Sequence, residues 1–263
     1  MDERLQPLRD AIDAVDRRLI DLLNERARLA IEVGRIKHAV GAPVYRPERE
    51  AEVLRKIAAL NHGPLTEAGV SGVWREVMAA CRALERPVTV AFLGPSGTFS
   101  ELALQKQFGS AVVREPCGSI DDVFRTVEAD GAEYGIVPVE NSTEGSVTRT
   151  LDLLLATPLR IIAEVSLPVH HNLLTLGGTM QGVKRICAHA QALAQCTAWL
   201  NLHHPDLERA PVSSNAEAAR LASTDPTVAA VAGDIAAQRY GLLAVATHIQ
   251  DDPHNRTRFV VLG

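Results

Sequence analysis

The chain has 263 residues, 46% of them hydrophobic and 22% charged, which suggests about two domains with separate cores and excludes a disordered or collagen-like chain. No apolar run reaches the ~20 residues that a membrane span needs, and the first residues lack the apolar stretch of a signal peptide. The net charge of −5 argues against general affinity for nucleic acid.

The first predicted element is one long helix. From Leu5 to Ile36 the apolar residues are spaced alternately three and four apart, which is typical of one face of a helix of about 30 residues. Such a helix is ~45 Å long, so we expect it to pack against a second copy of itself. Gly41-Ala42-Pro43 ends it, and further helices are predicted from Pro47 to Leu60 and from about Thr66 to Glu85. Residues 1–87 are therefore expected to form an all-α three-helix module.

From Val88 on, short apolar runs alternate with helical segments. This alternation predicts βα units around a mainly parallel sheet, so residues 88–263 are expected to form an α/β module. The predicted strands are 88–93, 135–139, 159–165, 183–188 and 228–232. The predicted helices are 146–155, 190–200 and 216–222, and another helical segment follows residues 94–97.

One position in the first apolar stripe is occupied by Arg26, where the spacing requires an apolar residue. Arginine is rarely buried unless it meets an anion. Lys37 lies on almost the same helix face, ~16 Å farther along the axis, so the two side chains could hold a small dianion between them. The alternative is that Arg26 pairs with a neighbouring glutamate and Lys37 is solvated at the helix end.

Four segments of this module resemble the all-helical chorismate mutases, and the resemblance covers residues 5–86. The segments are 7–12, 24–26, 33–37 and 43–50. That family forms an intertwined dimer in which the long first helices cross. By position, the resemblance implies that Arg9 acts from the partner chain and that Arg26 holds a carboxylate within its own chain. It also implies that Lys37 reaches the ether oxygen and that Glu50 meets the substrate hydroxyl.

The implied Claisen rearrangement needs no acid, base or nucleophile, only a compact conformer and charge placed against the breaking C–O bond. Three positions depart from the family pattern: Arg46 replaces an aspartate, Cys81 a serine and Glu85 a glutamine. Because a carboxylate donates a hydrogen bond only when protonated, Glu85 predicts a mutase favoured by acid. Each departure could also be a neutral surface change.

Three polar segments adjoin predicted strands of the α/β module: Gly94 to Ser100, Val137 to Ser146 and Asn255 to Phe259. Open α/β sheets bind ligands at the carboxyl ends of their strands, and backbone N–H groups at a helix start attract anions. The first segment could equally be an ordinary tight turn.

Together with residues 189–196 and 213–216, these segments resemble the catalytic domain of prephenate dehydratases, over residues 88–263. That family has two α/β lobes like a periplasmic binding protein, with prephenate in the cleft between them. The resemblance implies lobes of about 88–165 plus 247–263, and 166–246. The chain crossings are then expected near 164–169 and 246–252.

The resemblance implies that Thr257, in the motif Thr257-Arg258-Phe259, helps the ring hydroxyl to leave as water. Loss of carbon dioxide and aromatisation drive that step, so a weak acid such as a hydroxyl could suffice. Asn141 and Ser142 would hold the substrate. Arg258 is a candidate for binding a carboxylate, or else forms a structural ion pair.

Two pairs of adjacent histidines, His170-His171 and His203-His204, raise the question of a metal. Adjacent residues of a strand point to opposite faces, so no metal is expected, and no cofactor is implied. The four cysteines are scattered, with no CxxC pair, which predicts reduced thiols and a cytoplasmic protein.

We therefore expect a bifunctional enzyme of phenylalanine biosynthesis, with chorismate and prephenate as its substrates. Residues 1–87 would make prephenate, and residues 88–263 would convert it to phenylpyruvate. Two alternatives stay open: arogenate as the second substrate, or a non-catalytic two-lobed binding module on a helical dimerisation stalk. Arg26 argues against the stalk, because a stalk would place leucine there.

Relatives with both modules normally continue into a phenylalanine-binding ACT domain, whereas this chain stops at Gly263, so a dehydratase insensitive to phenylalanine is expected.

Overall fold

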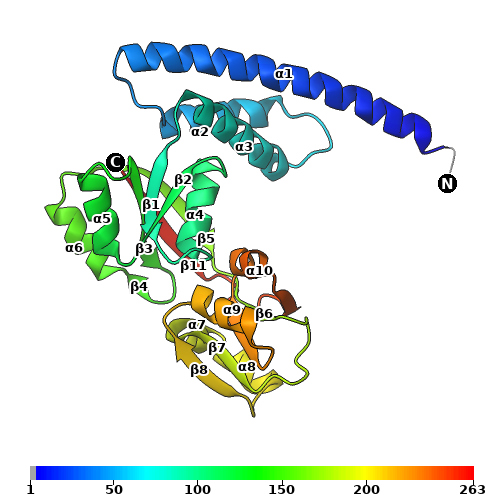
Figure 1. Ribbon diagram of the computed structural model, residues 1–263, viewed down its shortest axis with the longest axis vertical. Coiled ribbons are helices and arrows are strands. Elements are labelled where there is room, and N and C mark those ends of the chain that lie inside the picture. Colours follow the sequence, from blue (N-terminus) through cyan, green and yellow to red (C-terminus); the bar gives the residue numbers. More distant parts are fainter. Residues whose placement is uncertain (1–3) are drawn as a thin grey trace. The chain divides into compact units, whose positions relative to one another are not determined.

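The structure, a computed structural model, describes residues 4–263 (Figure 1). Its contacts divide the chain into two compact units. The helical unit contains the residues up to Val88 together with Phe108–Val113, and the α/β unit contains Thr89–Gln107 and Arg114–Gly263. Within the described residues, no helix is both long enough and apolar enough to cross a membrane.

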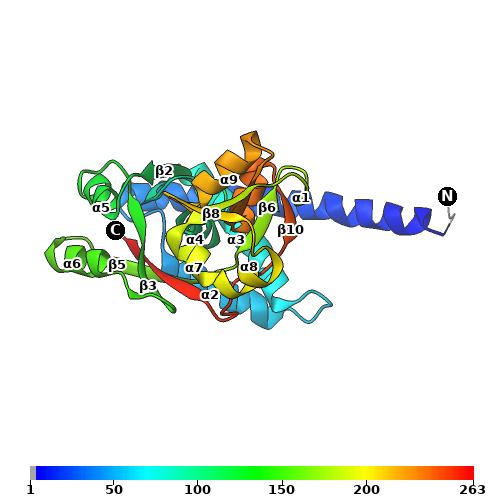
Figure 2. The ribbon, with the colours of Figure 1, turned by 90° about the horizontal axis from the view of Figure 1, so that it is seen from below.

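The helical unit consists of α1 (Gln6–Ala39), α2 (Pro47–Leu60) and α3 (Glu67–Glu85). The helix α1 is continuous over 34 residues, and Figure 2 shows its N-terminal part from a second direction. Proline stands in the first turn of both α1 and α2, where its missing N–H costs no hydrogen bond. At the start of α3 the Thr66 side chain accepts a hydrogen bond from the Gly69 amide at 3.1 Å, so Thr66 is the predicted N-cap.

The apolar stripe of α1 is largely uncovered in the single chain. Among the described residues of α1, only Gly34 is buried. Leu8, Leu29 and Ile36 are each more than 60% exposed. Gly34 is buried because α3 lies close to it there: a Cβ atom at position 34 would lie 2.7 Å from Cγ of Glu85.

The α/β unit contains two sheets. The strands of the first are β1 (Thr89–Leu93), β2 (Val113–Cys117), β3 (Tyr134–Asn141), β4 (Gly145–Ser146), β5 (Ile161–Pro168) and β11 (Arg256–Leu262). They lie in the order β2-β1-β3-β11-β5, with β4 added to β3. The helices α4 (Phe99–Phe108), α5 (Ile120–Glu128) and α6 (Thr148–Ala156) connect them. Val123, Phe124 and Val127 bury the apolar face of α5 on this sheet.

The strands of the second sheet are β6 (Asn172–Thr175), β7 (Arg185–His189), β8 (Glu208–Val212), β9 (Val228–Ala232) and β10 (Leu243–Ala246). Their order is β10-β6-β9-β7-β8. Its helices are α7 (Ala190–Gln195), α8 (Thr197–His203), α9 (Asn215–Thr224) and α10 (Asp234–Tyr240). All five residues of β9 are buried, as expected for a central strand with helices on both faces.

The expectation of mainly parallel sheets is wrong. In the first sheet β1 pairs parallel with β3, but β11 runs antiparallel to both β3 and β5. In the second sheet β9 and β8 run parallel to β7, but β6 runs antiparallel to β9 and to β10. The cause is the chain path. The chain leaves the first sheet after Pro168, builds the second, and returns so that β11 enters the middle of the first sheet from the opposite direction (Figure 1, red).

Candidate active sites

A cavity of about 420 Å³ lies in the helical unit, which we call the helical-unit cavity. It contains side chains from all three helices. Six of the residues singled out from the sequence line it: Arg26, Lys37, Arg46, Glu50, Cys81 and Glu85. Arg9 does not line it and lies exposed on α1.

Lys37 and Glu85 form an ion pair in this cavity. Nζ of Lys37 lies 3.2 Å from Oε2 of Glu85 and also donates to the carbonyl oxygen of Val44 at 3.1 Å. The Glu85 side chain is only 9% exposed and packs against Gly34. The close packing of Glu85 on Gly34 therefore helps to position the Glu85 carboxylate beside the Lys37 ammonium group.

Glu50 pairs with Arg82, a residue that the sequence analysis did not single out. Arg82 is 5% exposed, donates to the Glu50 carboxylate and to the carbonyl oxygen of Phe108, and lies over the Tyr45 ring at 5.1 Å. Burial raises the pKa of Glu50, although the nearby cations, Arg82 first, lower it. Arg26 was singled out because it is a cation at an apolar helix position. Arg82 also occupies such a position, so the same rule could have found it.

Arg46 and Cys81 line the same cavity in different ways. Arg46 is exposed at the N-cap of α2 and donates to Glu48 at 2.8 Å. Cys81 is 6% exposed and lies one residue before Arg82 on α3. Arg49 also lines the cavity.

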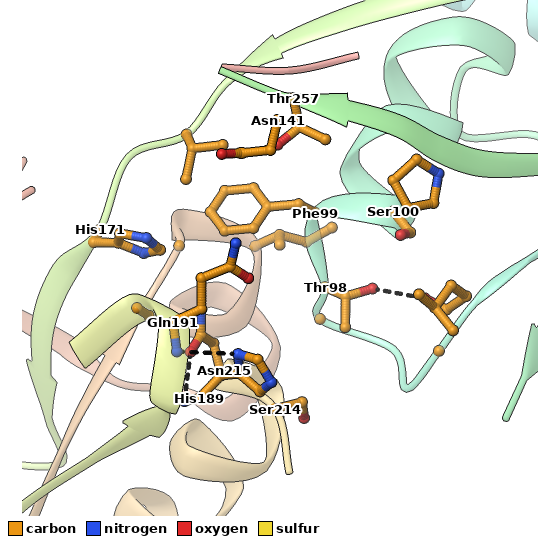
Figure 3. A pocket seen from close by; sticks show the side chains of 18 of the residues that line it. Thr98, Phe99, Ser100, Asn141, His171, His189, Gln191, Ser214, Asn215 and Thr257 are labelled. Atoms are coloured by element: carbon orange, nitrogen blue, oxygen red, sulfur yellow. Dashed lines mark hydrogen bonds between the residues drawn. The ribbon is translucent and has the colours of Figure 1, made fainter. Parts of the chain in front are cut away.

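A second cavity, of about 390 Å³, lies in the α/β unit, and we call it the α/β cavity. The residues that line it come from the strands of both sheets and from the loops and helices next to those strands. Figure 3 shows Asn141 and Thr257 of the first sheet on one wall and His189, Gln191, Ser214 and Asn215 across from them. Among the described residues that line this cavity there is no lysine, arginine, aspartate or glutamate. Its polar groups are hydroxyls, amides, histidines and backbone.

Thr257 lies on β11 directly opposite Asn141 on β3 and is 9% exposed. Nδ2 of Asn141 donates to the Thr257 hydroxyl oxygen at 2.8 Å. Oδ1 of Asn141 accepts from the backbone amides of Thr143 and Glu144 at 3.0 and 3.2 Å, which fixes the orientation of the amide group. The Thr257 oxygen is therefore an acceptor toward Asn141, and its hydrogen remains available to a group in the cavity.

Of the residues singled out for substrate binding in this unit, Asn141 lines the α/β cavity and Ser142 and Arg258 do not. Ser142 follows the end of β3, and its hydroxyl accepts from the backbone amide of Arg256 at 3.0 Å. Arg258 follows Thr257 on a strand, so its side chain points to the opposite face. There it donates to Glu164 at 2.8 Å and to Glu140 at 2.7 Å, and this pairing raises its pKa. The ion pair, one of the two alternatives for Arg258, is therefore formed in this structure, and its role toward a substrate carboxylate stays a prediction.

His171 is a cavity residue that sequence reasoning considered only for metal binding. It is 2% exposed, its Nε2 lies 3.0 Å from Oε1 of Gln195, and its ring meets that of Phe99 edge-on at 5.7 Å. Burial lowers the pKa of His171, although the contact with Gln195 raises it, and burial therefore favours the neutral ring. Within residues 4–263, no group of three His, Cys, Asp or Glu side chains could hold a metal ion.

Each cavity lies in a part of the chain that matches a different protein family. Residues 8–86 match the family model described as chorismate mutase type II, and residues 90–263 match the one described as prephenate dehydratase. All described residues that line the helical-unit cavity fall in the first match, and those that line the α/β cavity fall in the second.

Curated relatives carry both parts in one chain. The bifunctional chorismate mutase/prephenate dehydratase of Neisseria gonorrhoeae is 54% identical over 266 residues, which cover 100% of this chain and 73% of that protein. The protein of the same name from Pseudomonas aeruginosa is 48% identical over 268 residues, which cover 99% of this chain and 73% of that protein. The structure of prephenate dehydratase from Arthrobacter aurescens in complex with L-Phe is similar with a TM-score of 0.62 and 38% identity, over 67% of this chain and 60% of that chain.

Proposed function

The chain belongs to the bifunctional chorismate mutase/prephenate dehydratase family, and from that premise we propose which residues carry each reaction. The protein rearranges chorismate to prephenate and converts prephenate to phenylpyruvate in phenylalanine biosynthesis. We assign one reaction to each cavity because the described residues that line a given cavity all fall within the match to a single family.

For the mutase reaction we propose that the helical-unit cavity binds chorismate as a dianion. Arg26 holds one carboxylate, and Lys37 places its positive charge against the ether oxygen as the C–O bond breaks. Glu85, held beside Lys37, donates to the same oxygen when protonated. Glu50 accepts a hydrogen bond from the substrate hydroxyl, and Arg46 and Cys81 complete the wall.

We propose that the mutase works as a homodimer in which Arg9 of each chain enters the cavity of the other. Two observations support this. The apolar stripe of α1 is exposed in the single chain, and Arg9 lies on α1 outside its own chain's cavity. A second copy of α1 packed on the stripe would bury it and bring an Arg9 to each site.

For the dehydratase reaction we propose that prephenate binds in the α/β cavity with its ring hydroxyl at Thr257. The bond from the ring to its carboxylate breaks and releases carbon dioxide, and its electron pair enters the ring. The C–O bond breaks, and the oxygen leaves with its electrons as water after taking a proton from the Thr257 hydroxyl. Thr257 recovers a proton from water. Asn141 acts by keeping the Thr257 hydrogen free for this step.

We also propose limits for the domains and a location for the enzyme. The mutase domain is residues 1–87, and the dehydratase domain is 88–263, with lobes of about 88–165 plus 247–263, and 166–246. The strand order supports the lobes, because every strand of the second sheet lies between residues 172 and 246. The four buried, unpaired cysteine thiols suit the reducing cytoplasm.

One assay tests the division of labour. Purified protein is incubated with chorismate, and the loss of chorismate and the formation of phenylpyruvate are followed separately. The variants Arg26→Ala and Thr257→Ala should each lose one of the two signals when chorismate and prephenate are supplied in separate reactions. Loss of both activities in either variant contradicts the assignment.

A mixing experiment tests the shared site. Arg9→Ala and Lys37→Ala chains are each expected to lack mutase activity, but a heterodimer of the two contains one complete cavity. Unfolding and refolding the chains together should therefore restore a fraction of the wild-type rate. No recovery, in a mixture shown by mass to contain heterodimers, contradicts the partner role of Arg9.

A further inference from the structure

A path of amide side chains joins the two sheets beside the α/β cavity. Asn255 is 2% exposed and lies on the returning segment just before β11. Its Oδ1 accepts from Nδ2 of Asn141 at 3.2 Å, and its Nδ2 donates to Oε1 of Gln195 at 3.0 Å. We call Asn141, Asn255 and Gln195 the amide relay. Of these three residues, Asn141 and Gln195 line the cavity and Asn255 does not.

The backbone fixes the direction of every hydrogen bond in the relay. Oδ1 of Asn141 faces two backbone N–H groups, which can only donate, so its Nδ2 must face Thr257 and Asn255. Asn255 then presents its oxygen to Asn141 and its NH2 group to Gln195. Oε1 of Gln195 is thus an acceptor, and His171, whose Nε2 lies 3.0 Å away, carries its hydrogen on Nε2.

We propose that Asn255 is a positioning residue of the dehydratase, which holds the Gln195 wall of the cavity against Asn141 and so against the Thr257 hydroxyl. An amide is suited to this task because it offers an acceptor on one arm and a donor on the other. This proposal rests on the role proposed above for Thr257.

Backbone hydrogen bonds hold the same segments together without the Asn255 side chain. The amide of Val169 donates to the carbonyl oxygen of Asn255 at 2.8 Å, and the amide of Asp251 donates to that of Gln195 at 2.7 Å. The side chain of Asn255 therefore adjusts the alignment of two walls that the backbone already brings together. Its replacement should alter the rate more than the fold.

Asn255→Asp separates positioning from structure. At neutral pH the carboxylate presents a second acceptor to Oε1 of Gln195, and kcat for prephenate should fall roughly 10- to 100-fold, the effect of an unsatisfied buried pair. A protonated carboxyl restores the donor and keeps the acceptor. Lowering the pH from about 8 to about 6 should thus recover activity relative to wild type, because burial raises the pKa of a carboxyl. KM should change less than kcat.

The comparison is the ratio of variant to wild type at each pH, which cancels the groups that titrate in both proteins. The charged and titratable groups around the amide relay include His171, which meets Gln195, and four residues on the segment of Asn255: Asp251, Asp252, His254 and Arg256. Asn201→Asp is the matched control, because it makes the same change at an exposed position of α8. Its ratio to wild type should stay constant with pH.

Mutase activity and the thermal unfolding curve of the same samples report folding. A ratio that does not change with pH, or a loss confined to KM, overturns the proposal. If Asn255→Asp unfolds, Asn255→Ala replaces it and should lower kcat equally at all pH values, and an unchanged kcat overturns the proposal. An active Thr257→Ala contradicts the proposed site, whereas an inactive Thr257→Ala beside fully active Asn255 variants contradicts only the relay.

Discussion

The two cavities of this chain use opposite electrostatics on chemically related substrates. The helical-unit cavity gathers four arginines and a lysine around two glutamates. The α/β cavity has no charged acid or base among its described lining residues. Both substrates carry two carboxylates, so the difference lies in what each reaction requires of its protein.

The rearrangement keeps all atoms, so the protein can lower the barrier only by shaping the substrate and placing charge at the breaking bond. The dehydration gains its driving force from carbon dioxide release and aromatisation, and a fixed cation beside the departing carboxylate would hold it back. Neutral donors, such as the backbone amides at the start of α9 beside Ser214, attract anions without retaining them as strongly as a fixed cation would. The comparison therefore predicts a charge-dependent mutase and a geometry-dependent dehydratase.

The largest effect is expected at Thr257. Thr257→Ala removes the proton donor, and kcat for prephenate should fall roughly 100- to 10,000-fold, the usual contribution of a positioned acid. Thr257→Ser keeps the hydroxyl and should stay much closer to wild type. Phenylpyruvate formation measures the change, and mutase activity should be unaltered. A Thr257→Ala enzyme within a few-fold of wild type contradicts this side of the comparison.

The charge-dependent side is tested at Lys37. Lys37→Ala removes the positive charge from the ether oxygen and should lower the mutase rate by roughly 100-fold or more, as the loss of one such group does elsewhere. Lys56, an exposed lysine that pairs with Glu52 on α2, gives the matched control Lys56→Ala. Chorismate loss measures both. Equal mutase rates in the two variants would contradict the proposed role of Lys37 at the ether oxygen.

The close contact at Gly34 is tested by Gly34→Ala. The added Cβ would lie 2.7 Å from Cγ of Glu85, so the Glu85 side chain, or the two helices with it, must shift where Lys37 meets Glu85. The mutase rate should drop roughly 10- to 100-fold, because such displacements misplace the catalytic charge. Gly72→Ala is the control, since no atom lies within 4 Å of a Cβ there. Dehydratase activity should be the same in both variants as in the wild type.

The mutase should depend on pH through the carboxylate of Glu50. Burial raises the pKa of Glu50, so its protonation begins at a higher pH than in a free glutamate, and the mutase rate should fall several-fold as acid neutralises it. Glu50→Gln should remove this acidic limb. An unchanged pH profile in Glu50→Gln would contradict this role.

The smallest expected effect is that of salt. Raising the ionic strength from about 0.05 to about 0.5 M shortens the screening length and should raise KM for chorismate two- to threefold. KM for prephenate should change less, because the described lining of the α/β cavity has no fixed ionic charge. Initial rates at several sodium chloride concentrations measure both. Equal salt dependence would remove the electrostatic contrast.

The sequence predicts the helices of the helical unit to within a few residues, because a helical period and its capping residues are local signals. Thr66 and Pro47 start helices where expected. The place of β11 between β3 and β5 is different. It depends on pairing between segments about a hundred residues apart, and no local pattern encodes the direction of that pairing.

The candidate sites divide in the same way. Arg26, Lys37 and Glu50 were found by helical spacing and by resemblance, and they line one cavity. Arg82 could have been found by the rule that singled out Arg26. The strand alternation that argued against a histidine metal site also predicts that Arg258 and Thr257 lie on opposite faces of β11. The amide relay could not be predicted, because Asn255 and Gln195 meet only through the crossing of the chain between sheets.

The position of β11 has a consequence for how the protein is made. The ribosome completes β3 and β5 long before β11, with the entire second sheet synthesised in between. Until β11 arrives, both strands have an unpaired edge in the middle of an unfinished sheet, and such edges invite pairing with other chains. The nascent enzyme thus passes through an aggregation-prone stage in which its mutase helices are complete and its dehydratase is not. The strand that ends this stage is the one that carries Thr257, so the dehydratase site forms only when the exposed edges are closed.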